Sequence, residues 1–319
     1  MADKPLMLLW TDGAPIYVEA LAAAGLGDRL RLEGIDRSKA PSDAQKAEAE
    51  MMLAWGAPAG LLAEMPKLRW VQTTTAGVEA WLSRPDLSDG LLLTAAKGVH
   101  RVQMPENILA ALFHATKPIA AAAIDQLSST WTRRVAVPLA GQTLGILGLG
   151  TIGAELARKA AALELRVVGV RRSPGEVEHV DTVYAPQDTD RMLAESDFVL
   201  NLLPVTPETV DFMDAERFAA MKPGAWFLNF GRGATVVDAD LIAAVTGGAI
   251  AGAVLDVFRK EPLPGDDPFW TTPGISVWPH VGGLHPDRDA IVAGLVVENT
   301  GRYLKGEPLL HQVDRERGY

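Results

Sequence analysis

The segment LGILGLGTIGAELARKAAAL constrains the fold of this chain more than any other. An apolar run leads into a GxGxxG loop, and apolar residues then recur at the spacing of one helix face. Gly148 permits a tight turn, Gly150 permits close approach of the backbone to a pyrophosphate, and Gly153 permits close packing of helix on strand. We therefore predict a strand–loop–helix unit whose helix amides, at Thr151 and Ile152, bind phosphate. The alternative is a glycine-rich turn that binds nothing.

Two arginines stand where such loops usually place a carboxylate. An acidic residue about 20 positions after the first glycine normally accepts a hydrogen bond from the ribose 2′-hydroxyl of NAD. Here the next apolar run, LRVVGV, is followed by Arg171, Arg172 and Ser173. Arginine binds a 2′-phosphate bidentately, so the sequence predicts a preference for NADP(H) of about ten- to a hundredfold. The alternative is that both arginines are solvated at a strand end.

Short apolar runs alternate with helical patterns along the whole chain, as in parallel sheets built from βα units. We predict an α/β fold with a Rossmann-type doubly wound parallel sheet and a smaller flavodoxin-like α/β substrate domain. The predicted strands are LMLLW, EMMLAW, LRWVQTTT and GLLLTAAK in the first part, then TLGILGLG, LRVVGV, DFVLNLL, AWFLNF, IAGAVLDV and GISVWP.

The 319 residues fit two domains of roughly 100–200 residues each. We expect a discontinuous substrate-binding domain, residues 1–100 with 284–319, and a dinucleotide-binding domain, residues 101–283. The segment MPENILAALFHATKPIAAAAIDQL predicts a helix that is bent or broken near Pro118, because proline lacks the amide and clashes with the preceding turn. The last helix, AIVAGLVVENTGRYLKG, is free to return to the first domain.

Composition excludes several classes of function. With 48% hydrophobic and 22% charged residues the chain is globular, and its net charge of −10 offers no global field for nucleic acid or an anionic membrane. An anionic substrate must then be bound by local cations or backbone amides. The absence of cysteine excludes disulfides, thiolate catalysis and cysteine-ligated zinc, and we expect no metal site. Without a signal peptide or an apolar run of 18 residues, a cytoplasmic location is expected.

Three chemically useful side chains follow predicted strands of the second sheet. Arg232 comes just after AWFLNF, Glu261 follows IAGAVLDV, and His280 ends the run GISVWPH. The carboxyl ends of parallel strands line the ligand crevice of an open sheet, so these side chains are expected to converge. Together they suit a 2-keto acid: arginine binds the carboxylate and polarises the carbonyl, histidine donates a proton, and glutamate orients the imidazole. Taken singly, each is more often a salt bridge or a cap.

The order of motifs carries a family resemblance. GxGxxG, LLPVTPET, NFGRG, LDVFRKEPLP and PHVGG, in that order, resemble the D-2-hydroxyacid dehydrogenase family over nearly the whole chain. The resemblance implies that Arg232, Glu261 and His280 are catalytic, that a cleft separates the two domains, and that the terminal helix completes the first. The ending GEPLLHQVDRERGY, with LDVFRKEPLP, is similar more narrowly to the family's NADPH-dependent glyoxylate/hydroxypyruvate reductases of the A type.

The resemblance also implies further cofactor contacts beyond the glycine loop and the arginines. These are Leu203, Pro204, Thr209, Phe230, Gly231, Asp256, Gly282 and Gly283. Asp256 matches the residue that bonds the carboxamide, although a strand-end cap is the alternative. The chain departs from the family where Trp278 replaces a frequent threonine, and where Gly282 and Gly283 replace small or hydroxyl residues.

The substrate pocket is expected to include a first-domain loop. TTTAGVE resembles the family's substrate loop, and the amides of Ala76, Gly77 and Val78 would bind a carboxylate as an anion nest. An ordinary strand–helix turn is the alternative. Trp55 is expected to form a wall of the substrate pocket; the alternative is that it lies in the core.

For two further segments the sequence leaves two alternative locations open. His100 and Arg101, in the expected crossing between domains, face either the cleft or solvent. Trp131 matches a family position that reaches toward a second subunit, which predicts a homodimer; a core position in a monomer is the rival.

Three functions remain open at this point. The first is NADPH-dependent reduction of glyoxylate or hydroxypyruvate, with a small 2-keto acid as the only partner besides a second copy of the chain. The second keeps this chemistry with bulkier 2-keto acids. The third is a dinucleotide-sensing scaffold similar to the family's transcriptional corepressors.

Overall fold

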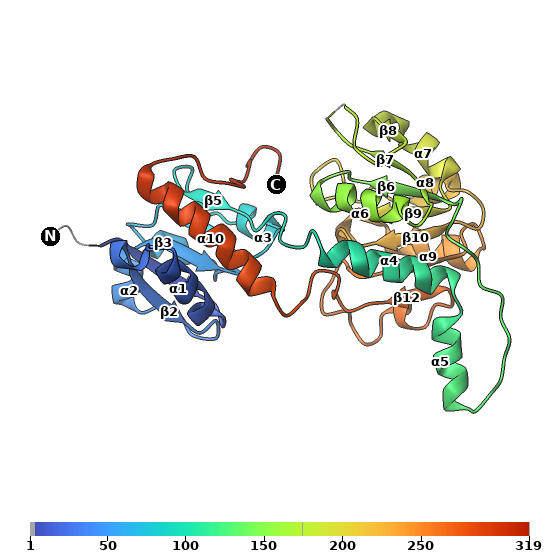
Figure 1. Cartoon of the computed structure of the whole chain (residues 1–319), viewed down its shortest axis with the longest axis horizontal. Helices are drawn as coiled ribbons and strands as arrows, with labels where there is room; N and C mark the ends of the chain where they lie inside the picture. Colours follow the sequence, from blue (N-terminus) through green and yellow to red (C-terminus); the bar gives the residue numbers. More distant parts are fainter. Residues whose placement is uncertain (1–3, 174, 319) are drawn as a thin grey trace. The chain divides into compact units, whose positions relative to one another are not determined.

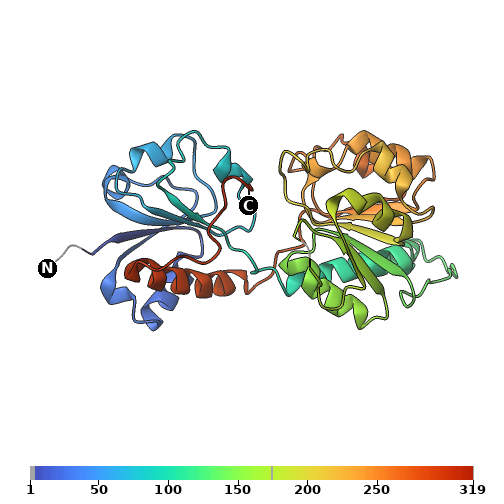
Figure 2. The same cartoon turned by 90° about the horizontal axis from the view of Figure 1, so that it is seen from above.

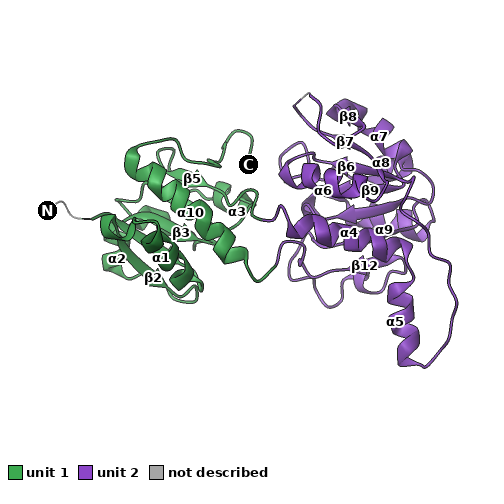
Figure 3. Ribbon diagram, viewed as in Figure 1, with its two compact units in different colours: residues 1–99, 285–319 green, residues 100–284 purple. Residues whose placement is uncertain are grey.

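The computed structural model describes residues 4–173 and 175–318. The chain divides into two compact units, with residues 1–99 and 285–319 in unit 1 and residues 100–284 in unit 2 (Figure 3). Each unit contains one parallel sheet of its own, of five strands in unit 1 and seven in unit 2.

The sheet of unit 1 has the strand order β2-β1-β3-β4-β5, which is the flavodoxin order. Its strands are β1 (Leu6–Trp10), β2 (Arg31–Ile35), β3 (Ala49–Ala54), β4 (Trp70–Thr73) and β5 (Leu92–Thr94). The helices of this unit are α1 (Ala14–Ala23), α2 (Asp43–Glu48), α3 (Glu79–Leu82) and α10 (Arg288–Lys305). The predicted smaller flavodoxin-like fold is confirmed.

Helices cover both faces of this sheet, as Figure 2 shows. Along β1, Met7 and Leu9 pack with α1 and α10, while Leu8 packs with Trp81 of α3 on the opposite face. All five residues of β1 are buried, because a parallel sheet covered on both sides leaves neither face to water. The apolar run LMLLW is the sequence signature of that burial.

The sheet of unit 2 has the order β12-β11-β10-β9-β6-β7-β8, which is the Rossmann order with one additional strand. Its strands are β6 (Thr143–Leu147), β7 (Arg166–Val170), β8 (Thr182–Tyr184), β9 (Phe198–Asn201), β10 (Trp226–Asn229), β11 (Gly252–Leu255) and β12 (Ile275–Val277). The helices are α4 (Gln103–Thr116), α5 (Ile119–Leu127), α6 (Thr151–Ala161), α7 (Thr189–Glu195), α8 (Ala215–Ala220) and α9 (Asp238–Thr246). The predicted Rossmann-type sheet is confirmed.

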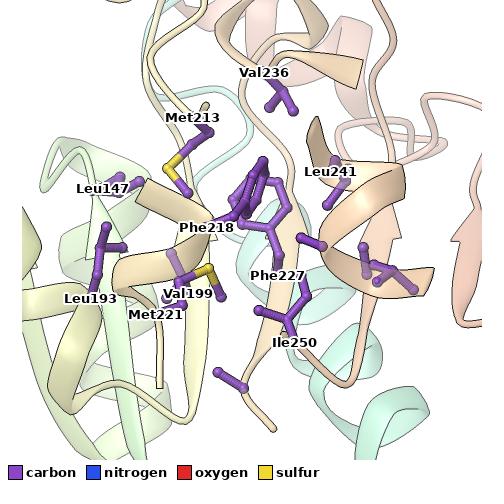
Figure 4. Packing of buried hydrophobic residues seen from close by; sticks show 14 of the residues in the cluster. Leu147, Leu193, Val199, Met213, Phe218, Met221, Phe227, Val236, Leu241 and Ile250 are labelled. Carbon is purple, nitrogen blue, oxygen red and sulfur yellow. The ribbon is translucent and has the colours of Figure 1, made fainter. Parts of the chain in front are cut away.

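Two apolar clusters hold this sheet, one on each face. In the cluster beneath α7, α8 and α9, Phe218 meets Phe227 edge to face with ring centroids 5.3 Å apart (Figure 4). Edge-to-face aromatic packing of this kind adds to the free energy gained by burial alone. The strand ends that carry the polar residues discussed below therefore project from a closely packed layer.

The expected break near Pro118 is confirmed. α4 ends at Thr116, α5 begins at Ile119, and the two helices are bent by 68° to each other. None of the residues of α5 is buried, and in Figure 1 this helix stands away from the sheet of its unit. Among the described residues no single helix is long and apolar enough to cross a membrane; α4 and α5 reach that length and composition only when counted together across the bend.

Two strands lie outside the sequence prediction. β2 (RLEGI) and β8 (TVY) are half-exposed strands at the edges of their sheets. An edge strand keeps one side in contact with water, so it lacks the continuous apolar run that marks a buried parallel strand.

Candidate active site

The glycine loop connects β6 to α6 and takes the conformation that its glycines permit. Gly148 has a φ of +100°, which a residue with a side chain rarely adopts. A Cβ on Gly153 would lie 2.8 Å from the carbonyl oxygen of Gly148, so only glycine lets the helix pack this closely. Gly150 is the N-cap of α6, and a Cβ there would meet open space. The uncapped amides of Thr151 and Ile152 begin the helix.

The two arginines follow β7, the strand beside β6. The amide of Arg171 bonds the carbonyl of Tyr184 at 3.2 Å, which continues the pairing with β8 beyond the strand end. Arg171 is half-buried, and Arg172 and Ser173 are exposed. These residues therefore lie at the same carboxyl edge of the sheet as the glycine loop.

The loop after β9 contacts the loop after β10. A Cβ on Gly231 would lie 2.8 Å from the carbonyl oxygen of Leu203, so the two backbones touch at a glycine. Thr209 closes the first of these loops by donating to the carbonyl of Pro204 at 2.6 Å. The structure thus places Leu203, Pro204, Thr209 and Gly231 together.

His280 and Glu261 form a hydrogen-bonded pair. Nδ1 of His280 lies 2.6 Å from Oε2 of Glu261, and Oε1 of the same carboxylate accepts the amide of Phe258 at 2.8 Å. The imidazole is half-exposed, and its residue has a φ of +54°. One oxygen of the Glu261 carboxylate is therefore bonded to the backbone, and the other is bonded to the imidazole of His280.

Arg232 lies in the loop after β10, packed against the loop that carries Glu261. A Cβ on Gly233 would lie 1.9 Å from the carbonyl carbon of Phe258, far inside contact distance. Glycine at this position is therefore what allows the arginine loop to lie directly on the glutamate loop. Arg232 itself is half-buried, and its Nη1 donates to the carbonyl of Gly231 at 2.9 Å.

Asp256 directly follows β11 and anchors the histidine loop. Its two carboxylate oxygens accept the amides of Val281 and Gly282, at 2.7 and 2.9 Å. Burial raises the pKa of Asp256, and the two amide bonds oppose that rise. A Cβ on Gly282 would lie 2.6 Å from Oδ2 of Asp256, which explains glycine at this position. The two bonds are those expected of a strand-end cap, the alternative role that the sequence leaves open for Asp256.

Trp278 packs beneath the histidine loop. Its ring meets Phe230 edge to face with centroids 5.8 Å apart, and meets His114 of α4 in the same way at 6.2 Å. Burial lowers the pKa of His114, which shares a 2.7 Å hydrogen bond with Ser276. The side chain of Phe230 is therefore part of the core, and its amide donates to the carbonyl of Asn201 at 3.1 Å.

The predicted substrate residues of unit 1 lie at the carboxyl edge of its sheet. Three threonines precede Ala76, and the hydroxyl of Thr75 donates to the carbonyl of Gly77 at 2.7 Å. Trp55 follows β3 and is 53% exposed, so the core alternative is wrong. The Arg37 guanidinium lies 4.9 Å from the centre of its ring.

The remaining predicted residues lie on the surface of unit 2 or close to it. Arg101 pairs with Glu155 of α6 at 3.0 Å. His100 is half-buried beside Gly283, where a Cβ would lie 2.9 Å from the imidazole. Trp131 is 93% exposed, which excludes the alternative of a buried core residue.

Two asparagines that the motifs did not single out lie at the centre of these loops. Asn201 and Asn229 end β9 and β10, are buried, and hydrogen-bond each other at 3.1 Å. The available signal is an asparagine closing each of two apolar runs, VLN and FLN, since a buried amide needs partners.

The residues at this edge fit a dinucleotide. The open space beside Gly150, the uncapped start of α6 and the close approach of Gly153 to Gly148 are the features by which such a loop binds a pyrophosphate. Arg171 and Arg172 follow the adjacent strand, where the adenosine ribose lies in sheets of this order. Backbone amides at a helix start and arginine guanidinium groups are hydrogen-bond donors that suit anionic phosphate groups.

Fold and site together define an oxidoreductase of the dinucleotide-binding class. Residues 109–282 match the family model described as D-isomer specific 2-hydroxyacid dehydrogenase, NAD binding domain. The chain belongs to the D-isomer specific 2-hydroxyacid dehydrogenase family.

Individual relatives extend the similarity over the whole chain. The glyoxylate/hydroxypyruvate reductase A of Photorhabdus laumondii is 31% identical over 278 residues, which cover 85% of this chain and 88% of that protein. A D-isomer specific 2-hydroxyacid dehydrogenase from Xanthobacter autotrophicus Py2, solved with NADPH and MES, is 34% identical to this chain, and the two structures have a TM-score of 0.88. The match covers 99% of this chain and 100% of that one. The NADPH-dependent glyoxylate/hydroxypyruvate reductase of Sinorhizobium meliloti, solved with NADP and sulfate, is 31% identical with a TM-score of 0.84, at 99% and 100% coverage.

Proposed function

We propose that the protein reduces a small 2-keto acid, glyoxylate or hydroxypyruvate, to glycolate or D-glycerate with NADPH. The observation that carries the proposal is the 2.6 Å pair of His280 and Glu261 at the carboxyl edge of a Rossmann sheet. Such a pair supplies a positioned proton donor beside the cofactor edge of the fold. The reductases of Photorhabdus laumondii and Sinorhizobium meliloti support the choice of substrate.

The chain's own residues divide the work between binding and proton transfer. Bound NADPH supplies the hydride that adds to the carbonyl carbon. Arg232 binds the substrate carboxylate and polarises the carbonyl through its planar set of donors. Glu261 holds Nδ1 of His280, which directs Nε2 of the imidazole to the substrate, and Nε2 gives the carbonyl oxygen its proton. The product is the 2-hydroxy acid, and the imidazole regains its proton from solvent.

NADPH is preferred over NADH in this proposal because of Arg171 and Arg172. A 2′-phosphate gains charge-assisted hydrogen bonds there that a 2′-hydroxyl does not. The complexes of related proteins with NADPH and NADP are consistent with that preference. Because NADPH is a cofactor of the cell interior, the proposal keeps the expected cytoplasmic location.

We assign the binding roles by unit. Unit 2 binds the dinucleotide, through the glycine loop and the loops after β7, β9, β10 and β12. Unit 1 contributes the amides of Ala76 and Gly77, together with the exposed face of Trp55, to the substrate. Asp256 holds the histidine loop through its bonds with two backbone amides. Its proposed role toward the cofactor is to accept a hydrogen bond from the carboxamide of the nicotinamide.

We also propose that two copies of the chain form a dimer through α5 and the segment that follows it. Leu127, Trp131 and Val135 are all at least 90% exposed, on a part of unit 2 that stands away from its sheet. Soluble monomers rarely expose several large apolar side chains in one place, so a second copy is the occupant we assign to this surface.

The proposed activity is tested with a panel of four 2-keto acids. Oxidation of NADPH and of NADH is followed by absorbance with glyoxylate, hydroxypyruvate, pyruvate and phenylpyruvate. We expect the highest kcat/KM with glyoxylate or hydroxypyruvate and NADPH. Preference for phenylpyruvate would assign bulkier substrates, NADH at or above NADPH would refute the cofactor assignment, and no turnover of any acid would refute the reductase.

A further inference from the structure

Three buried polar side chains connect the loop after β9 to the loop after β10. Asn201, Asn229 and Thr235 are each at most 1% exposed, and all three are neutral. Asn201 and Asn229 are also register partners, facing each other where β9 and β10 end. Buried polar groups are costly unless they are hydrogen-bonded, so their partners show what this cluster does.

Asn201 distributes three hydrogen bonds between the two loops. Its Nδ2 donates to Oδ1 of Asn229 at 3.1 Å and to the hydroxyl of Thr235 at 2.7 Å. Its Oδ1 accepts the amide of Leu203 at 3.1 Å, two positions further along its own loop. Both amide hydrogens and the carbonyl of this side chain are thereby used.

Asn229 and Thr235 act on the backbone of the arginine loop. Oδ1 of Asn229 accepts the amide of Gly231 at 3.2 Å, and its Nδ2 donates to the carbonyl of Arg232 at 3.2 Å. The hydroxyl of Thr235 donates to the same carbonyl at 2.6 Å. The main chain on both sides of the Arg232 side chain is therefore bonded to buried groups.

We infer that Asn201, Asn229 and Thr235 are positioning residues that set the Arg232 guanidinium for the substrate carboxylate. The arginine side chain has many rotatable bonds, so its reach is defined only if the backbone from which it starts is fixed. The three side chains touch neither substrate nor cofactor in the proposed function, on which this inference rests. They act through the carbonyl of Arg232 and the amides of Leu203 and Gly231.

Thr235→Val is the most informative variant, because valine keeps the volume and removes only the hydroxyl. The carbonyl of Arg232 loses its shortest hydrogen bond, and Nδ2 of Asn201 loses one acceptor. We expect KM for glyoxylate to rise about tenfold, which corresponds to about 1.4 kcal/mol, while kcat and KM for NADPH change less than about threefold. Thr235→Ser, which keeps the hydroxyl, should restore KM to near the wild-type value.

Thr189→Val is the matched control. Thr189 is also a buried threonine of unit 2 whose hydroxyl donates to a backbone carbonyl, that of Pro186 at 2.6 Å, but it begins α7 and bonds neither loop. We expect Thr189→Val to lower Tm about as much as Thr235→Val and to leave KM for glyoxylate unchanged. If KM in Thr235→Val stays within about twofold of the wild type, or rises equally in Thr189→Val, the inference is wrong.

A binding measurement separates this inference from the proposed function. Oxalate, a two-carbon carboxylate that is not reduced, is titrated into the complex with NADP⁺ by calorimetry. Loss of oxalate affinity in Thr235→Val without turnover of any 2-keto acid by the wild type would refute the reductase and keep the positioning role. Normal turnover with unchanged oxalate affinity in Thr235→Val would refute the positioning role alone. A wild-type protein that neither binds oxalate nor turns over would refute both.

Discussion

Nδ1 of His280 lies 2.6 Å from Oε2 of Glu261, although 19 positions separate the two residues in the chain. The second carboxylate oxygen accepts the amide of Phe258, so the imidazole is held by a group that the backbone holds in turn. This arrangement binds Nδ1 of the ring to the carboxylate, and Nε2 is the nitrogen that the proposed function assigns to the substrate. The catalytic proposal depends on that division.

Replacement of His280 by asparagine removes the proton donor with little strain. Asparagine tolerates the φ of +54° found at this position better than most residues, so the loop should keep its conformation. We expect kcat with glyoxylate to fall by about 100- to 10,000-fold, the usual contribution of general acid catalysis. Affinity for NADP⁺, measured by calorimetry, should stay within about twofold. A kcat within tenfold of the wild type would remove His280 as the donor.

Removal of both arginines after β7 tests the choice of cofactor. In Arg171→Ala/Arg172→Ala we expect kcat/KM for NADPH to fall by about ten- to a hundredfold, because the 2′-phosphate loses its charged donors, while the value for NADH stays nearly constant. The control is Arg158→Ala on α6, where the arginine pairs with Glu155 at 2.7 Å. Equal losses for both cofactors in the double variant would contradict the assignment.

Gly233→Ala tests the contact between the arginine and glutamate loops. The new Cβ would lie 1.9 Å from the carbonyl carbon of Phe258, so the two loops must separate. We expect the free energy of unfolding to fall by about 1–3 kcal/mol, as is usual for overpacking, and kcat/KM to fall with it. Gly265→Ala is the control, because a Cβ there meets no atom within 4 Å. Denaturant unfolding measures the first effect, and unchanged stability would show that the loops separate freely.

The buried pair of Arg84 and Asp86 in unit 1 predicts a pH-dependent difference in stability. The two side chains are 8% and 6% exposed and lie 2.7 Å apart. Burial by itself raises the pKa of Asp86. The hydrogen bonds from Arg84 and from the amide of Leu62 lower the pKa by more than burial raises it, so the net shift is downward. The carboxylate therefore stabilises the folded state above the ordinary aspartate pKa of about 3.9, and this contribution is lost as the pH falls through the lower folded value.

Asp86→Asn should accordingly be less stable than the wild type by about 1.5–3 kcal/mol at pH 7, the range for a hydrogen bond to a charged group. The difference should shrink as the pH is lowered toward 3, which urea unfolding at several pH values measures. Asp89→Asn, at an exposed carboxylate nearby, should show neither effect. A difference that grows on acidification would contradict the sign of the shift.

The exposed apolar surface of α5 predicts the oligomeric state. Light scattering on the wild type should give the mass of two chains, and Leu127→Asp/Trp131→Glu should give that of one, because two charges then face the apolar interface. Ile16→Asp, at a partly exposed apolar residue of α1, should leave the dimer intact. A wild-type mass of one chain would refute the dimer.

The sequence predicted the parts of this protein that depend on local pattern. Apolar runs marked the buried strands, the spacing of Gly148, Gly150 and Gly153 marked the β6–α6 unit, and Pro118 marked the break between α4 and α5. Each of these is encoded within a few neighbouring residues, because strand burial, helix periodicity and backbone freedom are local properties. The half-exposed edge strands β2 and β8 were not predicted, since they lack such a pattern.

What the sequence by itself determined is therefore the order of the strands other than β2 and β8, the helices of the β6–α6 unit, of the Pro118 segment and of α10, and which polar side chains follow the strands. Only the tertiary structure decided how those side chains meet: Glu261 on His280, Gly233 against Phe258, and Asn201 between the loops of Leu203 and Arg232. These contacts join residues from different strand ends. They form because parallel packing brings the carboxyl ends of β9, β10, β11 and β12 to one edge, where each buried donor must find its acceptor on a neighbouring loop.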